Sequence, residues 1–190
     1  MAEIILASQS PRRKELLYQM GLDFEIISKN VPEDLIEEEP LEAAGKLALK
    51  KALAVAEDLS GEIVIGADTI VVLEGKILGK PDSFETAREM LAALSGRYHQ
   101  VITGVAVVDS RSGKYQLEQE TTGVYFRQLT DAMINSYVES GEPFDKAGAY
   151  GIQGKGGLFV TKLEGCYFNV VGLPISRLAV MLENYGFRVF

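Results

Sequence analysis

The sequence predicts an α/β protein in which helices flank a mixed β-sheet. Short apolar runs with strand character alternate with amphipathic segments of helical period, and 47% of the 190 residues are hydrophobic. Some strands are joined by short turns and others by whole helices, which indicates both antiparallel and parallel pairs. The length predicts one domain over residues 1–190, either undivided or with two closely packed lobes.

Turn and cap residues divide the first half of the chain. Ser10 and Pro11 are a typical N-cap and first helical residue, and Gly21 would end that helix. Pro40 opens a longer helix that should turn Leu41 and its neighbours Ala44, Leu47 and Ala48 inward. The expected elements are strand 4–7, helix 11–20, strand 24–28, helix 40–58, a strand 63–67 that ends on Asp68, and a hairpin of 70–73 and 76–78.

The second half continues the alternation. Asp82 and Glu85 have the spacing of a capping box, and Thr130 is a good N-cap. Residues 141–157 are expected to form a glycine-rich loop. The expected elements are helix 84–94, two long antiparallel strands 100–109 and 115–126, helix 131–139, strand 158–163 and helix 174–185.

Charge and composition exclude several classes of protein. The net charge is −8, whereas a protein that coats nucleic acid needs a basic surface, so we expect no nucleic-acid partner. A local basic pocket for a small anion remains compatible with this charge. The single cysteine, Cys166, cannot form an intrachain disulfide. Neither a signal peptide nor an apolar run near the ~18 residues of a membrane span is recognisable, so we expect a cytoplasmic protein.

The first candidate site lies between strand 4–7 and the following helix, at residues 8–13. Arg12 and Arg13 fall in the first helical turn, where the helix dipole already places positive charge. An anion bound there would offset this repulsion, because backbone N–H groups, the Ser8 hydroxyl and the guanidinium groups would converge on it. The segment therefore favours a phosphate site, and the alternative is a solvated arginine pair on a capped helix.

The second candidate is Asp68, with Thr69 beside it. Ligands in open α/β sheets usually bind at the carboxyl ends of strands, where we expect Asp68 to lie. A carboxylate there can hold a divalent cation or take a proton from water. The alternative is an aspartate that only caps the strand or turns the chain.

Lysines and a glycine-rich loop supply further candidates. Lys80 stands between Gly79 and Pro81, so its ammonium can be aimed at phosphate, and Lys50 or Lys51 could do the same from helix 40–58, although most helical lysines are solvated. Glu33 belongs to an acidic run that should be mostly solvated, but it could reach a metal.

In the loop 141–154, Tyr150 offers a ring to a ligand, and Gln153 offers a donor and an acceptor that match N3–H and O4 of a uracil-type base. The alternative is an ordered loop whose glycines serve only its shape. The lone histidine, His99, has no nucleophile pattern beside it and is expected to be structural or to lie at the surface.

Taken together and in this order, these segments resemble the Maf family of nucleotide pyrophosphatases. The likeness covers nearly the whole chain. It is carried by LASQSPRRKELL (6–17), GADT (66–69), GKP (79–81), SG (95–96), DKAGAYGIQG (145–154) and NVVGLP (169–174).

The resemblance implies a cytoplasmic hydrolase that converts a nucleoside triphosphate to the monophosphate and pyrophosphate with Mg²⁺ or Mn²⁺. It implies a strongly twisted sheet and two lobes with a cleft, as in inosine-triphosphate pyrophosphatases. Several family members are dimers, so a homodimer is one state to test. The pattern around Gln153 is similar to the branch that takes dTTP and UTP.

The resemblance also assigns residues to roles. Asp68 is the proton acceptor, and Glu33 would help it hold the metal. The substrate-binding residues are Ser8, Arg12, Arg13, Lys51, Thr69, Lys80 and Gln153. Three alternatives stay open: a pyrophosphatase for modified purine triphosphates, a nucleotide-binding regulator of cell division without turnover, and a nucleotidyl- or sugar-phosphate transferase.

Overall fold

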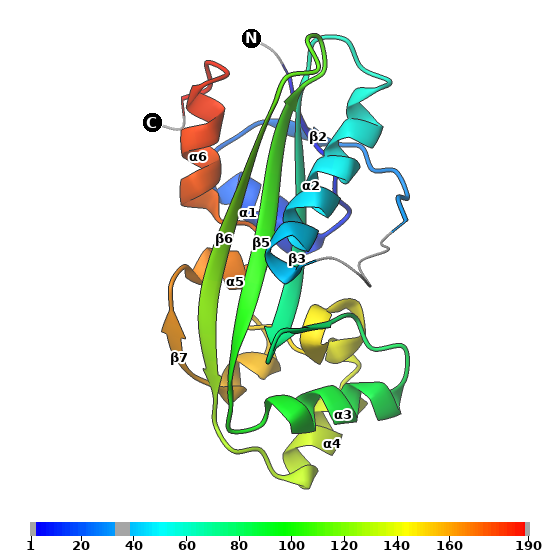
Figure 1. Ribbon diagram of the computed structural model, residues 1–190, viewed down its shortest axis with the longest axis vertical. Coiled ribbons are helices and arrows are strands. Elements are labelled where there is room, and N and C mark those ends of the chain that lie inside the picture. Colours follow the sequence, from blue (N-terminus) through cyan, green and yellow to red (C-terminus); the bar gives the residue numbers. More distant parts are fainter. Residues whose placement is uncertain (1–2, 33–38, 189–190) are drawn as a thin grey trace. The chain divides into compact units, whose positions relative to one another are not determined.

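The computed structural model, which describes residues 3–32 and 39–188, confirms a mixed α/β fold (Figure 1). Strand β1 (Ile4–Leu6) pairs in parallel with β2 (Phe24–Ile26) and with β3 (Ile63–Leu73). In contrast, β4 (Lys76–Leu78) runs antiparallel to β3. Both kinds of pairing therefore occur in one sheet, as predicted.

The long hairpin of β5 (Tyr98–Asp109) and β6 (Tyr115–Phe126) continues the sheet. The Asp109 amide donates to Lys114 O at one end, and the Phe126 amide donates to Arg97 O at the other, so the two strands run antiparallel. Strand β7 (Val160–Glu164) is antiparallel to β6. The strand order among the described residues is β2-β1-β3-β5-β6-β7, with β4 on β3.

The chain divides into two compact units. The first comprises Met1–Asp68, Thr103–Glu120 and Gly172–Phe190, and the second comprises Thr69–Ile102 and Thr121–Val171. Strands β3, β5 and β6 contribute residues to both. Helices α1 (Pro11–Gln19), α2 (Pro40–Ala56) and α6 (Ile175–Glu183) belong to the first unit, and α3 (Phe84–Leu94), α4 (Asp131–Glu139) and α5 (Tyr167–Val171) to the second.

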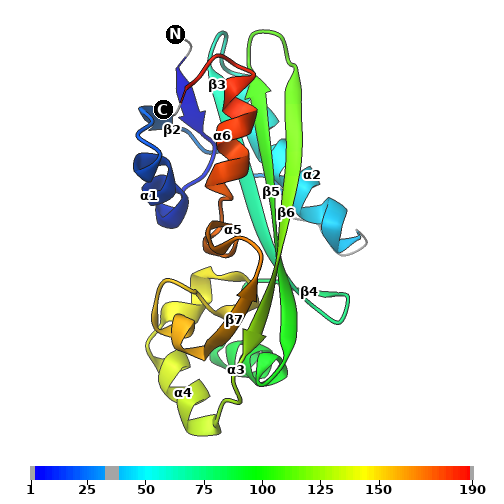
Figure 2. The same cartoon turned by 90° about the vertical axis from the view of Figure 1, so that its left-hand side faces the viewer.

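In the first unit, α2 covers one face of the strands, and α6 lies on the other side (Figure 2). Small side chains dominate the contact beneath α2. Its core consists of Ile5, Ala7, Ala48, Ala52, Val55, Ala56, Val64, Ala106 and Val108. The prediction that Leu41 points inward is wrong: its side chain is exposed, because it lies in the first turn of α2, outside the stripe that faces the sheet.

Two strand glycines let α2 approach the sheet closely. A Cβ on Gly66 would lie 2.8 Å from Ala52 Cβ and would also collide with the Ala48 carbonyl oxygen. A Cβ on Gly104 would lie 2.5 Å from the backbone nitrogen of Gly45. The helix backbone therefore rests directly on β3 and β5, and this contact fixes which side chains of α2 reach the end of the sheet.

The second unit packs α3 and α4 beside its part of the sheet (Figure 1). Thr130 caps α4 as predicted, since its side chain accepts from the Met133 amide. The predicted capping box at Asp82 is wrong: Ser83 is the N-cap of α3 and accepts from the Thr86 amide. Asp82 lies one residue too early and accepts from the Thr86 hydroxyl instead.

The expected glycine-rich loop 141–157 contains short 3₁₀-helices rather than plain loop. They are η1 (Glu142–Asp145), η2 (Ala147–Ala149) and η3 (Lys155–Phe159). The positive φ of Gly148, +66°, separates η2 from a regular helix, and a Cβ there would meet Val71 at 2.9 Å. Helix α5 was not predicted from the sequence. Within 3–32 and 39–188, none of the helices has the length and apolar character needed to span a bilayer.

Candidate functional site

Asp68 lies within β3 and not at its end. The sequence predicts that the strand stops at this residue, but β3 continues through Thr69 to Leu73. The reason is the neighbouring strands: β1 pairs with β3 only as far as the Leu6–Ile65 pair, whereas β5 borders β3 on its other side. Asp68 therefore comes after the last residue of β3 that pairs with β1. It still lies at the carboxyl end of the parallel pair of strands.

The carboxylate of Asp68 is paired with Lys51 from α2. Side chains alternate along a strand, so Asp68 projects from the same face as Gly66, against which α2 packs. Lys51 Nζ lies 2.6 Å from Asp68 Oδ1, and the two side chains are only 17% and 12% exposed. Because both side chains are largely buried, water screens this pair less than it would screen a surface salt bridge. The contact therefore fixes the positions of the two side chains relative to each other.

Ser8 and Arg13 form the second cluster of the first unit. The Ala7 amide donates to Ile65 O at 2.8 Å, so Ser8 leaves β1 at the same end of the parallel ladder that precedes Asp68. Ser8 Oγ accepts from Arg13 Nη1 and from the Ser10 amide, both at 3.2 Å. Arg13 Nε donates to Gly172 O at 2.8 Å. The guanidinium is thereby fixed from two directions.

The N-terminus of α1 differs from the prediction in one respect. Ser10 is the N-cap, but its side chain makes no capping hydrogen bond. Arg12 lies in the first turn of this helix and is half-buried. The first turn of α1 therefore carries two guanidinium groups without a side-chain cap, which is the electrostatic setting that favours an anion.

Three of the residues predicted to bind substrate, Thr69, Lys80 and Gln153, belong to the second unit. Lys80 is exposed and follows Gly79, whose carbonyl accepts from the Gly148 amide at 3.0 Å. This bond ties the lysine's segment to the start of the loop that carries Gln153. The Gln153 side chain is exposed, and Thr69 is half-buried in β3. Base contact by Gln153 and phosphate contact by Lys80 stay predictions.

Tyr150 cannot offer its ring to a ligand, so that prediction is wrong. The side chain is 5% exposed, packs edge-on against Phe126 and shares a 2.8 Å hydrogen bond between its hydroxyl and His99 Nε2. Burial raises the pKa of Tyr150. Burial also lowers the pKa of His99 to about 4, although a backbone contact with Arg97 opposes this. His99 is thus a neutral core residue, as expected.

The expected metal site is only partly within the described residues. Glu33 lies outside them. In the described part of the chain, no group of at least three histidine, cysteine or acidic side chains is arranged to hold a metal ion. The carboxylate of Asp68 still has the right chemistry, because Mg²⁺ prefers oxygen ligands and is often held by one or two carboxylates together with substrate phosphates.

Lys50 differs from its neighbour Lys51: it is exposed and donates to Pro32 O at 2.8 Å.

Several residues of the candidate sites were missed by sequence reasoning. Glu142 and Tyr137 hold the loop that carries Gln153, and Gly172 holds Arg13. Gly172 lies in the segment NVVGLP, whose position in the family pattern was a signal that could have drawn attention to it. Glu142 and Tyr137 had no such signal, because they act on backbone amides 13 or 14 residues away, which no local pattern identifies.

Comparison with solved structures finds weak likenesses, two of which follow. The nucleoside-triphosphatase, or dITP/XTP pyrophosphatase, of Mycobacterium abscessus is 16% identical with a TM-score of 0.46, over 67% of this chain and 75% of that one. The Ham1 protein of Staphylococcus aureus is 19% identical with a TM-score of 0.48, over 65% and 71% of the two chains.

Comparison with known sequences is decisive about the family. The model of the family described as Maf-like protein matches residues 3–185. Proteins named dTTP/UTP pyrophosphatase are similar to this chain over nearly their whole length: that of Alkaliphilus oremlandii is 54% identical and covers 97% of both chains. That of Carboxydothermus hydrogenoformans is 51% identical, over 97% of this chain and 100% of its own. The chain therefore belongs to the Maf family.

Proposed function

We propose that this chain is a pyrophosphatase that hydrolyses dTTP and UTP to the nucleoside monophosphate and pyrophosphate. The substrate assignment is supported by relatives with that name at about half identity over whole chains. The observation that carries the chemistry is the ion pair of Lys51 and Asp68 beside the segment of Ser8 and Arg13 at one end of the parallel ladder. It combines a carboxylate that can accept a proton with cationic groups that suit a triphosphate.

In the proposed reaction, water attacks the α-phosphorus in line with the leaving oxygen. A P–O bond forms at the α-phosphorus, and the bond from that phosphorus to the oxygen bridging the α- and β-phosphates breaks, so pyrophosphate leaves. Asp68 accepts a proton from the attacking water and orients it. Lys51, Arg12 and Arg13 neutralise the phosphate oxygens, and Lys80 supports the same charge from its own segment.

A divalent cation, Mg²⁺ or Mn²⁺, completes the proposal. Asp68 would hold it together with substrate phosphates, and Glu33 would add a second carboxylate. The cation would supply neutralisation of phosphate charge and a lower pKa of bound water. Base choice is assigned to Gln153, whose amide can donate to O4 and accept from N3–H of uracil and thymine. We also propose that the enzyme acts in the cytoplasm.

The proposal is tested by pyrophosphate release from a panel of triphosphates. UTP and dTTP should release pyrophosphate with Mg²⁺ and should lose that release when a chelator is added. Preference for a modified purine triphosphate would reject the substrate assignment. Binding without release would make the chain a regulator, and activity only with a second acceptor would make it a transferase.

A further inference from the structure

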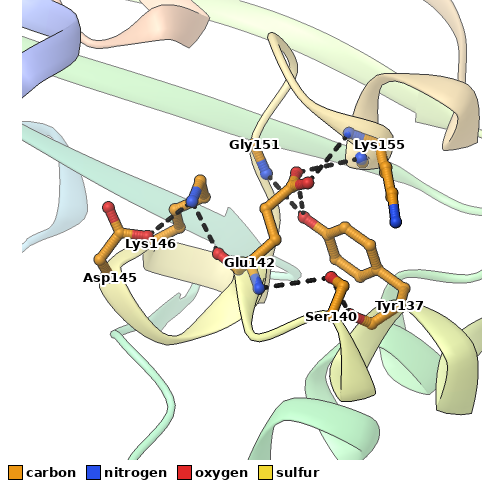
Figure 3. A network of polar contacts seen from close by, with 8 residues as sticks. Tyr137, Ser140, Glu142, Asp145, Lys146, Gly151 and Lys155 are labelled. Carbon is orange, nitrogen blue, oxygen red and sulfur yellow. Dashed lines mark hydrogen bonds and ion pairs between the residues drawn. The ribbon is translucent and has the colours of Figure 1, made fainter.

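The side chains of Tyr137 and Glu142 hold the segment 151–156, which carries Gln153, on both sides of that residue (Figure 3). Before Gln153, the Gly151 amide donates to the Tyr137 hydroxyl at 3.2 Å. After it, the amides of Lys155 and Gly156 donate to the Glu142 carboxylate at 3.0 and 3.3 Å. Gln153 therefore lies between two backbone attachments, and its own side chain is exposed.

The two fastening side chains also bind each other. The Tyr137 hydroxyl donates to Glu142 Oε1 at 2.8 Å, so one carboxylate accepts one hydroxyl and two backbone amides (Figure 3). The Tyr137 ring is buried and packs edge-on against Phe159, with ring centres 4.9 Å apart. A rigid aromatic side chain thus anchors the network in the core of the second unit.

The backbone of Glu142 is also held by hydrogen bonds. Its amide donates to Ser140 Oγ at 3.4 Å, and its carbonyl accepts from Lys146 Nζ at 2.6 Å. Lys146 is in turn paired with Asp145 at 2.5 Å. The carboxylate therefore projects toward the loop from a fixed point at the start of η1 (Figure 3).

Glycines leave the space that this network occupies. A Cβ on Gly154 would lie 2.7 Å from Glu142 Oε2, and a Cβ on Gly156 would lie 2.7 Å from the Tyr137 hydroxyl. Glycine spacing in this loop is thus explained by the approach of the carboxylate and the phenol. It does not require a ligand at those two positions.

The network is charged at neutral pH. Burial by itself would raise the pKa of Glu142, but the hydrogen bonds from Tyr137, Lys155 and Gly156 and the charge of Lys146 together lower it. Burial, and then the bond to Glu142, raise the pKa of Tyr137. The acceptor is therefore a carboxylate and the donor a neutral phenol, a combination that gives strong hydrogen bonds.

We propose that Glu142, with Tyr137, is a positioning residue for base selection, because it holds the backbone on both sides of Gln153 in the geometry that the amide needs. This inference rests on the proposed reading of the base by Gln153. Neither residue touches the nucleotide in this scheme. Each acts through the loop. Together they set the preference for uracil-type bases, which have O4 and N3–H, over cytosine-type bases, which have an amino group and an N3 without hydrogen.

The test compares Glu142→Gln with Glu139→Gln, a matched change at the exposed end of α4. The measurement is the ratio of kcat/KM for UTP to that for CTP. In Glu142→Gln one carboxylate oxygen becomes an amide group that faces N–H donors, so the ratio should fall about tenfold, the scale expected for one charge-assisted hydrogen bond. Glu139→Gln should leave the ratio unchanged. Hydrogen exchange of amides 151–156 should be faster in Glu142→Gln only.

Gln153→Ala separates this inference from the function on which it rests. If Gln153→Ala lowers the ratio, and the double variant with Glu142→Gln has the same ratio as Gln153→Ala alone, base reading by Gln153 and positioning by Glu142 are both supported. If Gln153→Ala lowers the ratio but Glu142→Gln does not, the positioning inference is wrong and base reading stands. If Gln153→Ala leaves the ratio unchanged, base reading is wrong, and the inference with it. Tyr137→Phe keeps the ring and should reproduce the effect if Glu142→Gln does not fold; failure of both to fold would mean a general structural role and would overturn the inference.

Discussion

Lys51 Nζ lies 2.6 Å from Asp68 Oδ1, so the proposed proton acceptor is ion-paired with a residue that is also assigned to phosphate. A carboxylate can take a proton from water. In the proposed reaction, the Lys51 ammonium also neutralises phosphate oxygens. A shared lysine of this kind would couple the binding of substrate to the environment of the base.

Replacing Asp68 by asparagine should remove the proton acceptor while preserving the shape of the side chain. We expect kcat for UTP to fall by roughly 10²–10⁴, the usual contribution of general acid–base catalysis. Steady-state kinetics with a circular dichroism melt measures both activity and folding. Asp23→Asn, at an exposed position, is the control. A folded Asp68→Asn enzyme with near-normal kcat would show that Asp68 is not the base.

Adjacent lysines of α2 provide a matched comparison. Lys51→Ala removes the partner of Asp68, whereas Lys50→Ala removes an exposed side chain that donates to the Pro32 carbonyl. We expect Lys51→Ala to lower kcat/KM by roughly 10²-fold or more, because a positioned charge on the phosphates is lost. Lys50→Ala should stay within about threefold of the wild type, as is usual for an exposed surface position. Equal effects of the two changes would contradict the assignment of Lys51.

Gly66→Ala should disturb the site through the fold. The added Cβ would meet Ala52 Cβ at 2.8 Å, so α2 must move away from β3. Overpacking of this kind typically lowers the free energy of unfolding by about 1–3 kcal/mol. Because the movement shifts Lys51 relative to Asp68, activity should fall further than the loss of folded protein explains. Gly79→Ala, where nothing lies within 4 Å of the added Cβ, is the control for stability.

His99 should make the fold sensitive to acid. It is the only histidine, and burial lowers its pKa from 6.5 to about 4 in the folded state. Between those values the unfolded chain binds a proton that the folded chain does not, so stability is complete above pH 6.5 and is lost as the pH falls toward 4. The loss is about 3 kcal/mol at 1.36 kcal/mol per pKa unit. Urea unfolding of the wild type and of His99→Gln from pH 7 to 4 measures it, and parallel pH profiles would contradict it.

Gln153→Glu should change base selection without unfolding the protein. A carboxylate presents only acceptors to O4, so activity with UTP and dTTP should fall by about tenfold or more, the cost of an unpaired polar contact. Thermal stability should be unchanged, since the Gln153 side chain is exposed. A nucleotide panel measures the preference. If the order of preference across the panel is the same as in the wild type, Gln153 does not read the base.

Local sequence signals predicted most of the secondary structure. Thr130 as an N-cap, the antiparallel pair of β5 and β6, and the end of α1 before Gly21 follow from the chemistry of single residues and their immediate neighbours. These features depend on few long-range contacts, so a sequence pattern identifies them.

The errors concern residues whose state depends on distant partners. The segment around Asp68 has the polar and glycine residues of a strand end, yet the strand continues because β5 borders it. Tyr150 sits in a loop rich in glycine, but its ring is enclosed by Phe126 and His99. The assignment of Lys51 was not an error, but its contact with Asp68 also depends on distant residues, because α2 lies on Gly66 and Gly104. Local sequence patterns alone do not determine any of these three features.

The position of bond cleavage tests the central claim most directly. UTP should be hydrolysed by the wild-type enzyme in water enriched in ¹⁸O, and the products analysed by mass spectrometry. Attack on the α-phosphorus predicts one ¹⁸O atom in UMP and none in pyrophosphate. Label in pyrophosphate with none in UMP would place the attack on the β-phosphorus, and formation of UDP with orthophosphate would place the cleavage between the β- and γ-phosphates. Either result would contradict the proposed function.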